Sequence, residues 1–164
     1  MREAVAAGDR RAREPRLHEV QVAIEVPFHD VDALGIVWHG HYYKYLELAR
    51  TALFRSRGLD ARDLVDLGYG MVMIESRCRH VSPLRYGERA RVAAWLADVK
   101  HRIRIDYEVT REPCGSRVAK AVTVLATLDR DRRLLLCTPA QILARLTESG
   151  RSVGDTVSAS SAAP

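Results

Sequence analysis

The chain has 164 residues, of which 47% are hydrophobic and 29% are charged, and its formal net charge is +5. This balance is typical of one globular domain and excludes a disordered chain, and no apolar run approaches the roughly 18–20 residues of a membrane-spanning helix. The charged N-terminus lacks the apolar stretch of a secretory signal, and the three cysteines form no CxxC pair, so we expect a cytoplasmic protein with reduced thiols.

Both ends of the chain are predicted to be disordered tails, because residues 1–17 are rich in Ala, Arg and Glu and residues 149–164 are small and polar. The predicted domain is the segment 18–148 between them. Its first element is VQVAIEV (20–26), where apolar and polar side chains alternate as in a strand. Apolar positions then recur at intervals of three and four, which predicts an amphipathic helix over 42–57.

A short helical segment over 61–68 follows, and the period of the pattern then changes to that of strands. Four long strand-like runs are joined by turn chemistry, at residues 71–81, 88–99, 102–111 and 117–129. A short strand is expected at 134–137, and Thr138-Pro139 predicts the N-cap and first-turn proline of a closing helix. A curved antiparallel sheet needs one face covered, and only the helix 42–57 is long enough. This order predicts an α+β hotdog fold, a sheet wrapped around one central helix, although ferredoxin-like and cystatin-like folds share parts of it.

Ionisable and aromatic residues are concentrated directly before the long helix, in FHDVDALGIVWHGHYYKYLELAR (28–50). The ordinary role of Asp30 and Asp32 at such a place is to cap helix amides or to form a turn. His39 and His41 are too few to hold a metal ion by themselves, and no HExxH motif or cysteine ligand supports them. The sequence therefore predicts no metal site.

The spacing Asp-x-Asp-Ala-x-Gly-Ile-Val-Trp-His-x-x-Tyr, followed by a helix with Tyr-Leu-Glu-x-Ala-Arg, resembles the 4-hydroxybenzoyl-CoA thioesterase family of hotdog proteins. Within that family, the pattern is most similar to the Tol-Pal-associated acyl-CoA thioesterase branch, and it extends from about Val20 to Leu146. The resemblance implies a thioester hydrolase that acts on acyl-CoA or on an acyl carrier protein and needs no cofactor. It also implies a homodimer, commonly assembled further into a tetramer, with the active site between subunits.

The resemblance also implies roles for single residues. Asp32 matches the family's catalytic carboxylate, as nucleophile or as general base on water. Gly35 matches the glycine that lets the loop turn close to the substrate, and His39 matches a histidine whose backbone N–H polarises the thioester carbonyl. Glu47 matches a helix glutamate and is the second candidate base. Phe28 stands where the nearest branch has a tyrosine, so this chain lacks that hydroxyl.

General chemistry agrees with this assignment, because thioester hydrolysis needs a carboxylate near the carbonyl carbon and a donor for the developing oxyanion. Asp32 lies seven residues before His39, on the loop that leads to a helix N-terminus with unpaired N–H groups. Whether the His39 imidazole takes part or only packs remains open, since the backbone amide serves either way. The arginine-rich composition suits an anionic substrate such as coenzyme A. The predicted substrate-binding residues are Gly35, Val37, Trp38, Tyr42, Arg79 and Arg85.

Other functions fit parts of the sequence. A hotdog dehydratase or hydratase would pair His39 with Glu47. A non-catalytic module that binds acyl thioesters or acyl carrier proteins would keep its affinity without Asp32. Nucleic-acid binding is not expected, because the basic residues are scattered through predicted strands without an RNA-binding aromatic signature.

Overall fold

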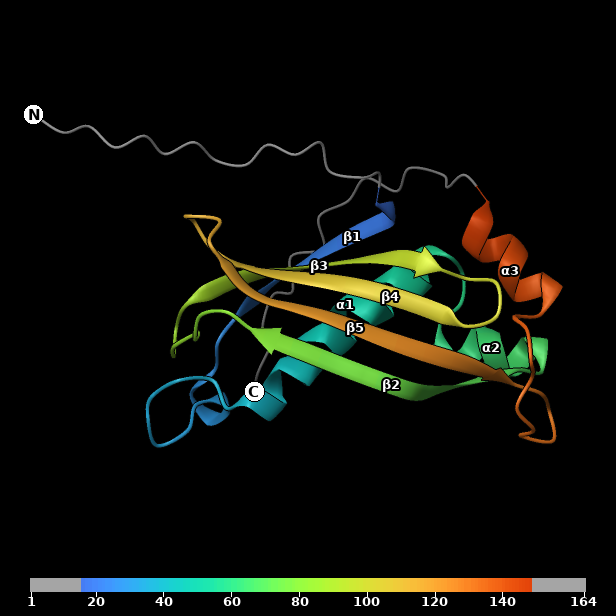
Figure 1. Ribbon diagram of the computed structural model, residues 1–164, viewed down its shortest axis with the longest axis horizontal. Helices are drawn as coiled ribbons and strands as arrows, with labels where there is room; N and C mark the ends of the chain where they lie inside the picture. Colours follow the sequence, from blue (N-terminus) through green and yellow to red (C-terminus); the bar gives the residue numbers. More distant parts are fainter. Residues whose placement is uncertain (1–15, 149–164) are drawn as a thin grey trace, which may run out of the picture.

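The structure is a computed structural model that describes residues 16–148. One antiparallel sheet has the strand order β1-β3-β4-β5-β2 (Figure 1). Its strands are β1 (Leu17–Glu25), β2 (Gly70–His80), β3 (Arg89–Asp98), β4 (Ile103–Arg111) and β5 (Arg117–Leu128). The helices are α1 (Tyr42–Ser56), α2 (Ala61–Leu67) and α3 (Ala140–Thr147), and short 3-10 turns are present at Phe28–Asp30 and His39–His41. The hotdog fold predicted from the sequence is confirmed.

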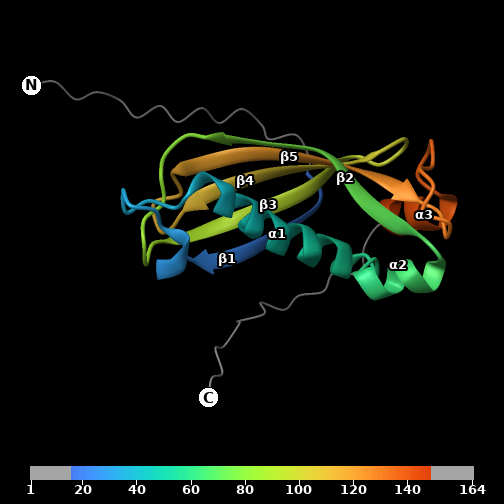
Figure 2. The same ribbon diagram turned by 90° about the horizontal axis from the view of Figure 1, so that it is seen from below.

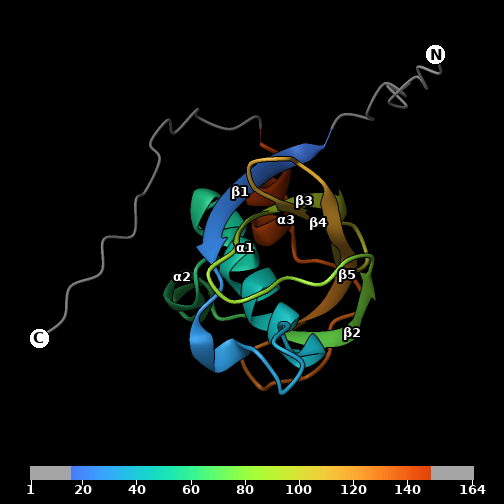
Figure 3. The same ribbon diagram turned by 90° about the vertical axis from the view of Figure 1, so that its left-hand side faces the viewer.

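The sheet curves around α1, which lies along its concave face (Figures 2 and 3). The buried face of α1 carries the residues whose spacing predicted the helix: Tyr42, Tyr45, Leu46, Ala49, Leu53 and Phe54. Along β4, Ile105 and Tyr107 join this core, whereas Asp106 and Glu108 alternate with them and therefore lie on the outer face. Each strand thus has one face toward α1 and one away from it.

The two ends of the sheet have different surroundings. Figure 1 shows α2 and α3 at one end, and the loop between β1 and α1 at the other end. The loop end also holds the turn between β2 and β3, because Ile36 forms an isolated bridge with Arg85. This arrangement places the residues before α1 next to the ends of several strands.

Two local predictions near the C-terminus are wrong. Residues 134–137 form no strand beyond a single bridge between Leu128 and Leu134, because their carbonyls bind a side chain instead: Arg102 Nη1 donates to the oxygens of Leu135 (3.2 Å) and Leu136 (3.0 Å). Thr138 does not cap the closing helix. Pro139 occupies the N-cap position, and within the described residues the buried hydroxyl of Thr138 has no hydrogen-bond partner.

The predicted tails lie almost entirely outside the described residues, and β1 begins at Leu17, close to the expected start of the domain. Among the helices of the described segment, none is both long enough and apolar enough to cross a bilayer. The cytoplasmic location stays a prediction from the sequence.

Candidate active site at the start of α1

The loop before α1 is a small hairpin held to the strands on either side of it. Val31 and Val37 form a bridge, and Asp32 N donates to Ile36 O at 2.9 Å. Val37 N donates to Leu84 O at 2.8 Å, which ties the loop to the turn after β2. These bonds fix the position of the hairpin tip at residues 32–35.

Asp32 lies at this tip and is partly exposed. Its Oδ1 accepts a hydrogen bond from Leu34 N at 2.8 Å, and its carbonyl oxygen accepts one from Gly35 N at 2.9 Å. Gly35 has φ of +71°, a conformation that side chains with a Cβ rarely adopt, so a glycine is required for the turn. Within residues 16–148, Oδ2 of Asp32 has no hydrogen-bond partner. The turn therefore orients the carboxylate and leaves one oxygen for chemistry.

Asp30, two residues earlier, is buried and fully engaged. It is 1% exposed, it accepts a hydrogen bond from Tyr45 Oη at 2.7 Å, and it forms an ion pair with Lys44. Burial alone would raise the pKa of Asp30, but the hydrogen bonds from Lys44 and Tyr45 outweigh it and hold this pKa below its ordinary value. Burial and the contact with Asp30 raise the pKa of Tyr45. Asp30 therefore anchors the loop to the first turns of α1.

The backbone of Asp30 orders the residues that lead into the helix. Its carbonyl oxygen accepts from Trp38 N at 3.0 Å and lies 3.0 Å from His41 Nδ1. The Trp38 indole folds over Gly40, where a Cβ would come within 2.0 Å of the ring. In the described structure neither Trp38 nor His41, the residues at the two N-cap positions, accepts a hydrogen bond from a helix amide with its side chain. The helix therefore begins with amides that no side chain caps.

Two histidines lie near the start of α1. His39 is exposed, with its ring centroid 4.7 Å from that of Trp38. His80, the last residue of β2, packs edge-on against Tyr42 with 4.6 Å between ring centroids. Burial lowers the pKa of His80, and the charge of His39 lowers it further, so His80 favours the neutral form. The sequence analysis missed His80, and only its place on the inward face of a predicted strand could have indicated it.

Glu47, the second candidate base, lies apart from the residues at the start of α1. Its side chain is 57% exposed and forms an ion pair with Arg50, one turn further along α1. Glu47 lies five residues into the helix, which is about 7.5 Å along its axis. Within the described residues no hydrogen bond or ion pair links it to Asp32 or His39.

The predicted substrate-binding residues fall into three groups. Val37 and Tyr42 belong to the buried core, and Tyr42 Oη accepts a hydrogen bond from Leu84 N at 3.2 Å. Gly35, Trp38 and Arg85 are exposed at or near the loop. Arg79 lies on the outer face of the sheet, since it alternates along β2 with Cys78, which packs against the core. Residues 16–148 contain no group of three or more His, Cys, Asp or Glu side chains suited to a metal ion.

Comparisons with known proteins agree with this architecture. The chain is 30% identical over 112 residues to a candidate esterase from Synechocystis sp., and the match spans 65% of each protein, less than two thirds of that relative. It is 28% identical over 115 residues to a candidate acyl-CoA thioesterase from Bacillus subtilis, covering 70% of this chain and 83% of the relative.

Its fold is similar to that of a 4-hydroxybenzoyl-CoA thioesterase variant solved in complex with 4-hydroxybenzoyl-CoA. The TM-score is 0.70 with 20% identity, over 79% of this chain and 99% of the other, and at this identity the likeness shows the fold alone. Residues 26–146 match the family model described as the Thioesterase-like superfamily, and this range covers the loop before α1 and the strands β2 to β5. The chain therefore belongs to the Thioesterase-like superfamily.

Proposed function

We propose that this protein hydrolyses acyl thioesters to a free carboxylic acid and a thiol, with Asp32 as the essential carboxylate. The observation that carries the proposal is the geometry of the hairpin tip. Leu34 N fixes one oxygen of the Asp32 carboxylate, while the other oxygen has no partner among residues 16–148. The anchored loop then leads directly to the uncapped amides at the start of α1. A base or nucleophile and an oxyanion donor are thus supplied by one segment.

The proposed reaction follows one of two balanced routes. As a general base, Asp32 takes a proton from water, the hydroxide adds to the carbonyl carbon, and collapse of the tetrahedral intermediate expels the thiolate. As a nucleophile, Asp32 attacks the carbonyl carbon and expels the thiolate, and water then hydrolyses the mixed anhydride. Both routes place negative charge on the former carbonyl oxygen. The amide of His39 and the other amides at the start of α1 would stabilise that charge, and this role needs no imidazole.

Acyl-CoA is the proposed substrate class, with an acyl carrier protein as the other thiol carrier. The name of the Bacillus subtilis relative supports the CoA ester. Trp38 is 47% exposed beside the helix start and is the residue best placed to contact the acyl group. Arg85 is exposed on the adjoining turn and could bind a phosphate.

We also propose a homodimer, built through β2, with a tetramer as its further assembly. β2 is an outer strand of the sheet, and its apolar residues Val72 (40%), Met73 (38%) and Ile74 (52%) are exposed. α1 packs chiefly against β1 and β3, so the inner face of β2 is covered less than the rest of the sheet. Pairing two β2 edges would remove unpaired backbone groups and bury these side chains. Light scattering of the native protein should give twice the monomer mass for the dimer or four times for the tetramer, and Ile74→Lys should shift it toward the monomer.

Thiol release from a panel of aliphatic and aromatic acyl-CoAs and acyl-carrier-protein thioesters tests the function. Asp32→Asn should lower kcat by about a thousandfold or more, because the amide can act neither as a base nor as a nucleophile. Glu47→Gln is the matched control on α1 and should stay within about threefold of the native rate. Activity that survives Asp32→Asn and is lost in Glu47→Gln would overturn the assignment of the base. No turnover of any thioester would favour a binding module instead.

A further inference from the structure

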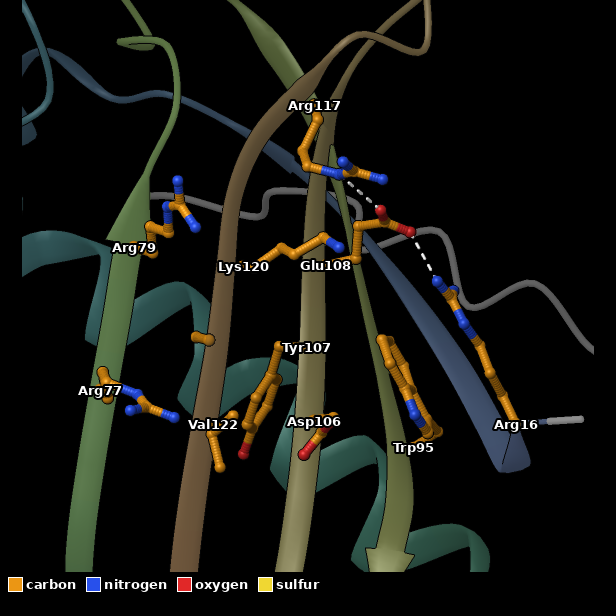
Figure 4. A pocket seen from close by; sticks show the side chains of 11 residues that line it. Arg16, Arg77, Arg79, Trp95, Asp106, Tyr107, Glu108, Arg117, Lys120 and Val122 are labelled. Atoms are coloured by element: carbon orange, nitrogen blue, oxygen red, sulfur yellow. Dashed lines mark hydrogen bonds and ion pairs between the residues drawn. The ribbon is translucent and has the colours of Figure 1, made fainter. Parts of the chain in front are cut away.

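A groove lies on the outer face of the sheet, on the opposite side from α1 (Figure 4). It encloses about 600 Å³ and crosses the strands from Arg16 and Trp95 on one side to Arg77 and Arg79 on the other. From β3 to β2 it spans three strand spacings, or about 14 Å. Its volume lies within the range of small-molecule sites. Asp32 does not line it.

The acidic side chains of the groove are already engaged. Glu108 is 3% exposed, and its carboxylate binds Arg16 Nη2 at 2.6 Å and Arg117 Nε at 2.9 Å. Asp106 accepts a hydrogen bond from Arg104 Nε at 2.8 Å. The half of the groove over β4 is therefore close to electrical balance.

The half over β5 and β2 is lined by three further cations and no acid, and Glu108, which is in register with Lys120 on β4, is already bound by Arg16 and Arg117. Arg77, Arg79 and Lys120 are exposed, and none of them forms a hydrogen bond or ion pair with another residue of the segment 16–148. Arg79 is paired in register with Lys120, so two like charges stand directly opposite each other on adjacent strands. Arg77 lies two residues away on the same face, about 7 Å along β2. Like-charge pairs at such positions are destabilising unless an anion lies between them.

Within residues 16–148, the acidic side chains that line the groove, Asp106 and Glu108, are already bound by arginines. A second copy placed on this face by two-fold symmetry would bring the same three cations toward one another. The C-terminal segment 149–164 has one acidic residue and one arginine, and the N-terminal segment 1–15 contains more arginines than acidic residues. The occupant that fits by charge is a separate anionic ligand.

We propose that the groove binds a nucleotide through its phosphate groups. Arg77 and Arg79 present planar donor forks that suit phosphate oxygens, and Lys120 adds a point charge between the strands. At the other side, Trp95 provides an aromatic ring. The Arg16 guanidinium carbon lies 3.8 Å from its centroid and covers one face, so a base would stack on the other face or displace Arg16. An indole of this kind suits a planar base. The nucleotide is either free or the nucleotide half of coenzyme A, which carries the same phosphate chemistry.

Calorimetric titration of the full chain with ADP and with pyrophosphate tests this site without any thioester. ADP should bind saturably and at least threefold more tightly than pyrophosphate, because only ADP reaches the Trp95 ring. The double variant Arg77→Gln/Arg79→Gln should weaken ADP binding tenfold or more. The matched control is Arg89→Gln. Arg89 lies on the same face of β3 as Trp95 but is paired with Glu25, so its substitution should leave the affinity for ADP unchanged.

Three results would overturn the proposal. They are the absence of saturable ADP binding up to millimolar concentration, equal affinity for ADP and pyrophosphate, and equal losses in the double variant and in Arg89→Gln. Thermal unfolding of each variant distinguishes a lost site from a lost fold. Because the titration does not depend on turnover, it can succeed or fail independently of the hydrolase assignment.

The source of the nucleotide is resolved by steady-state kinetics. If the groove holds the nucleotide half of CoA, ADP should compete with acyl-CoA, and the double variant should raise KM for acyl-CoA but not for the matching acyl-pantetheine. If the groove holds a free nucleotide, ADP should bind equally well in the presence of saturating acyl-CoA. Either pattern supports the site and identifies its ligand.

Discussion

The loop before α1 and the outer face of the sheet are built on the same plan. Each contains one carboxylate that is almost fully buried: Asp30 is 1% exposed and is bound by Lys44 and Tyr45, and Glu108 is 3% exposed and is bound by two arginines. Each also has a neighbouring charged group without a partner among residues 16–148. In the loop this group is the second oxygen of Asp32, and on the sheet it is the pair of arginines on β2. The sign of that unpartnered charge differs between the two regions.

This difference separates structural charges from charges available to a ligand. A buried carboxylate with several donors holds its surroundings in place, because its removal leaves buried donors unpaired. The second oxygen of Asp32 and the exposed arginines of β2 have no such partners among residues 16–148 and are accessible to a ligand. The loop thus presents a negative group suited to act on a carbonyl carbon, whereas the sheet presents positive groups suited to phosphate.

Removal of the Asp30 carboxylate should have the largest effect on stability. Asp30→Ala leaves Tyr45 and Lys44 without their acceptor, and we expect a loss of about 2–4 kcal/mol in the free energy of unfolding. For a chain of this size that corresponds to a fall of roughly 5–15 °C in Tm, which calorimetry would measure. Asp32→Ala, at the partly exposed tip, should change stability by less than about 1 kcal/mol. Similar losses in both variants would contradict the division of roles.

Removal of the Glu108 charge on the outer face of the sheet should lower the free energy of unfolding by less than removal of the Asp30 carboxylate. Glu108→Gln keeps the shape and one acceptor but removes the charge between Arg16 and Arg117, so we expect a loss of about 1–2 kcal/mol. Urea unfolding would measure it, with Asp106→Asn on the same face as the control. A loss larger than that of Asp30→Ala would reverse the ranking of the two regions.

The pKa of Asp30 predicts how stability changes with pH. Because this pKa is lower in the folded protein than its ordinary value of 3.8, the carboxylate stabilises the fold fully above that value. The contribution is lost as the pH falls below 3.8 and through the folded pKa. The stability difference between the native protein and Asp30→Asn should therefore shrink as the pH falls below 4. A difference that is unchanged down to pH 3 would show that another group is responsible.

A substitution at Gly40 should have the smallest effect on the protein, a local displacement of the Trp38 side chain. A Cβ there would come within 2.0 Å of the Trp38 ring, so Gly40→Ala must displace the indole from the start of α1. In a Trp95→Phe background, Trp38 is the only tryptophan, and its emission maximum should shift. Gly70→Ala is a control, because the added Cβ there makes only ordinary contacts with Leu128, at 3.7 and 3.8 Å. An unchanged spectrum in Gly40→Ala would mean that Trp38 does not cover the helix start.

The sequence predicted the helix 42–57 and the four long strands because periods of 3.6 and 2 follow directly from burial on one face. It also identified the loop, since the motif places Asp32 and Gly35 at a turn that requires a glycine. The resemblance singled out Asp32, but the pattern of residues alone gave Asp30 and Asp32 the same role, because the burial of Asp30 depends on Lys44 and Tyr45 in the first turn of α1. The sequence also did not place Arg79 on the outer face, since a bulge between Met73 and Glu75 shifts the register of β2.

The most direct test compares Asp30→Asn with Asp32→Asn in one acyl-CoA hydrolysis assay, at a temperature well below the Tm of both variants. We expect Asp32→Asn to lose about a thousandfold in kcat while its Tm stays near the native value. Asp30→Asn should lose several degrees in Tm and retain kcat within about tenfold. A native kcat in Asp32→Asn, or a greater loss of kcat in Asp30→Asn than in Asp32→Asn, would contradict the assignment of the reactive carboxylate.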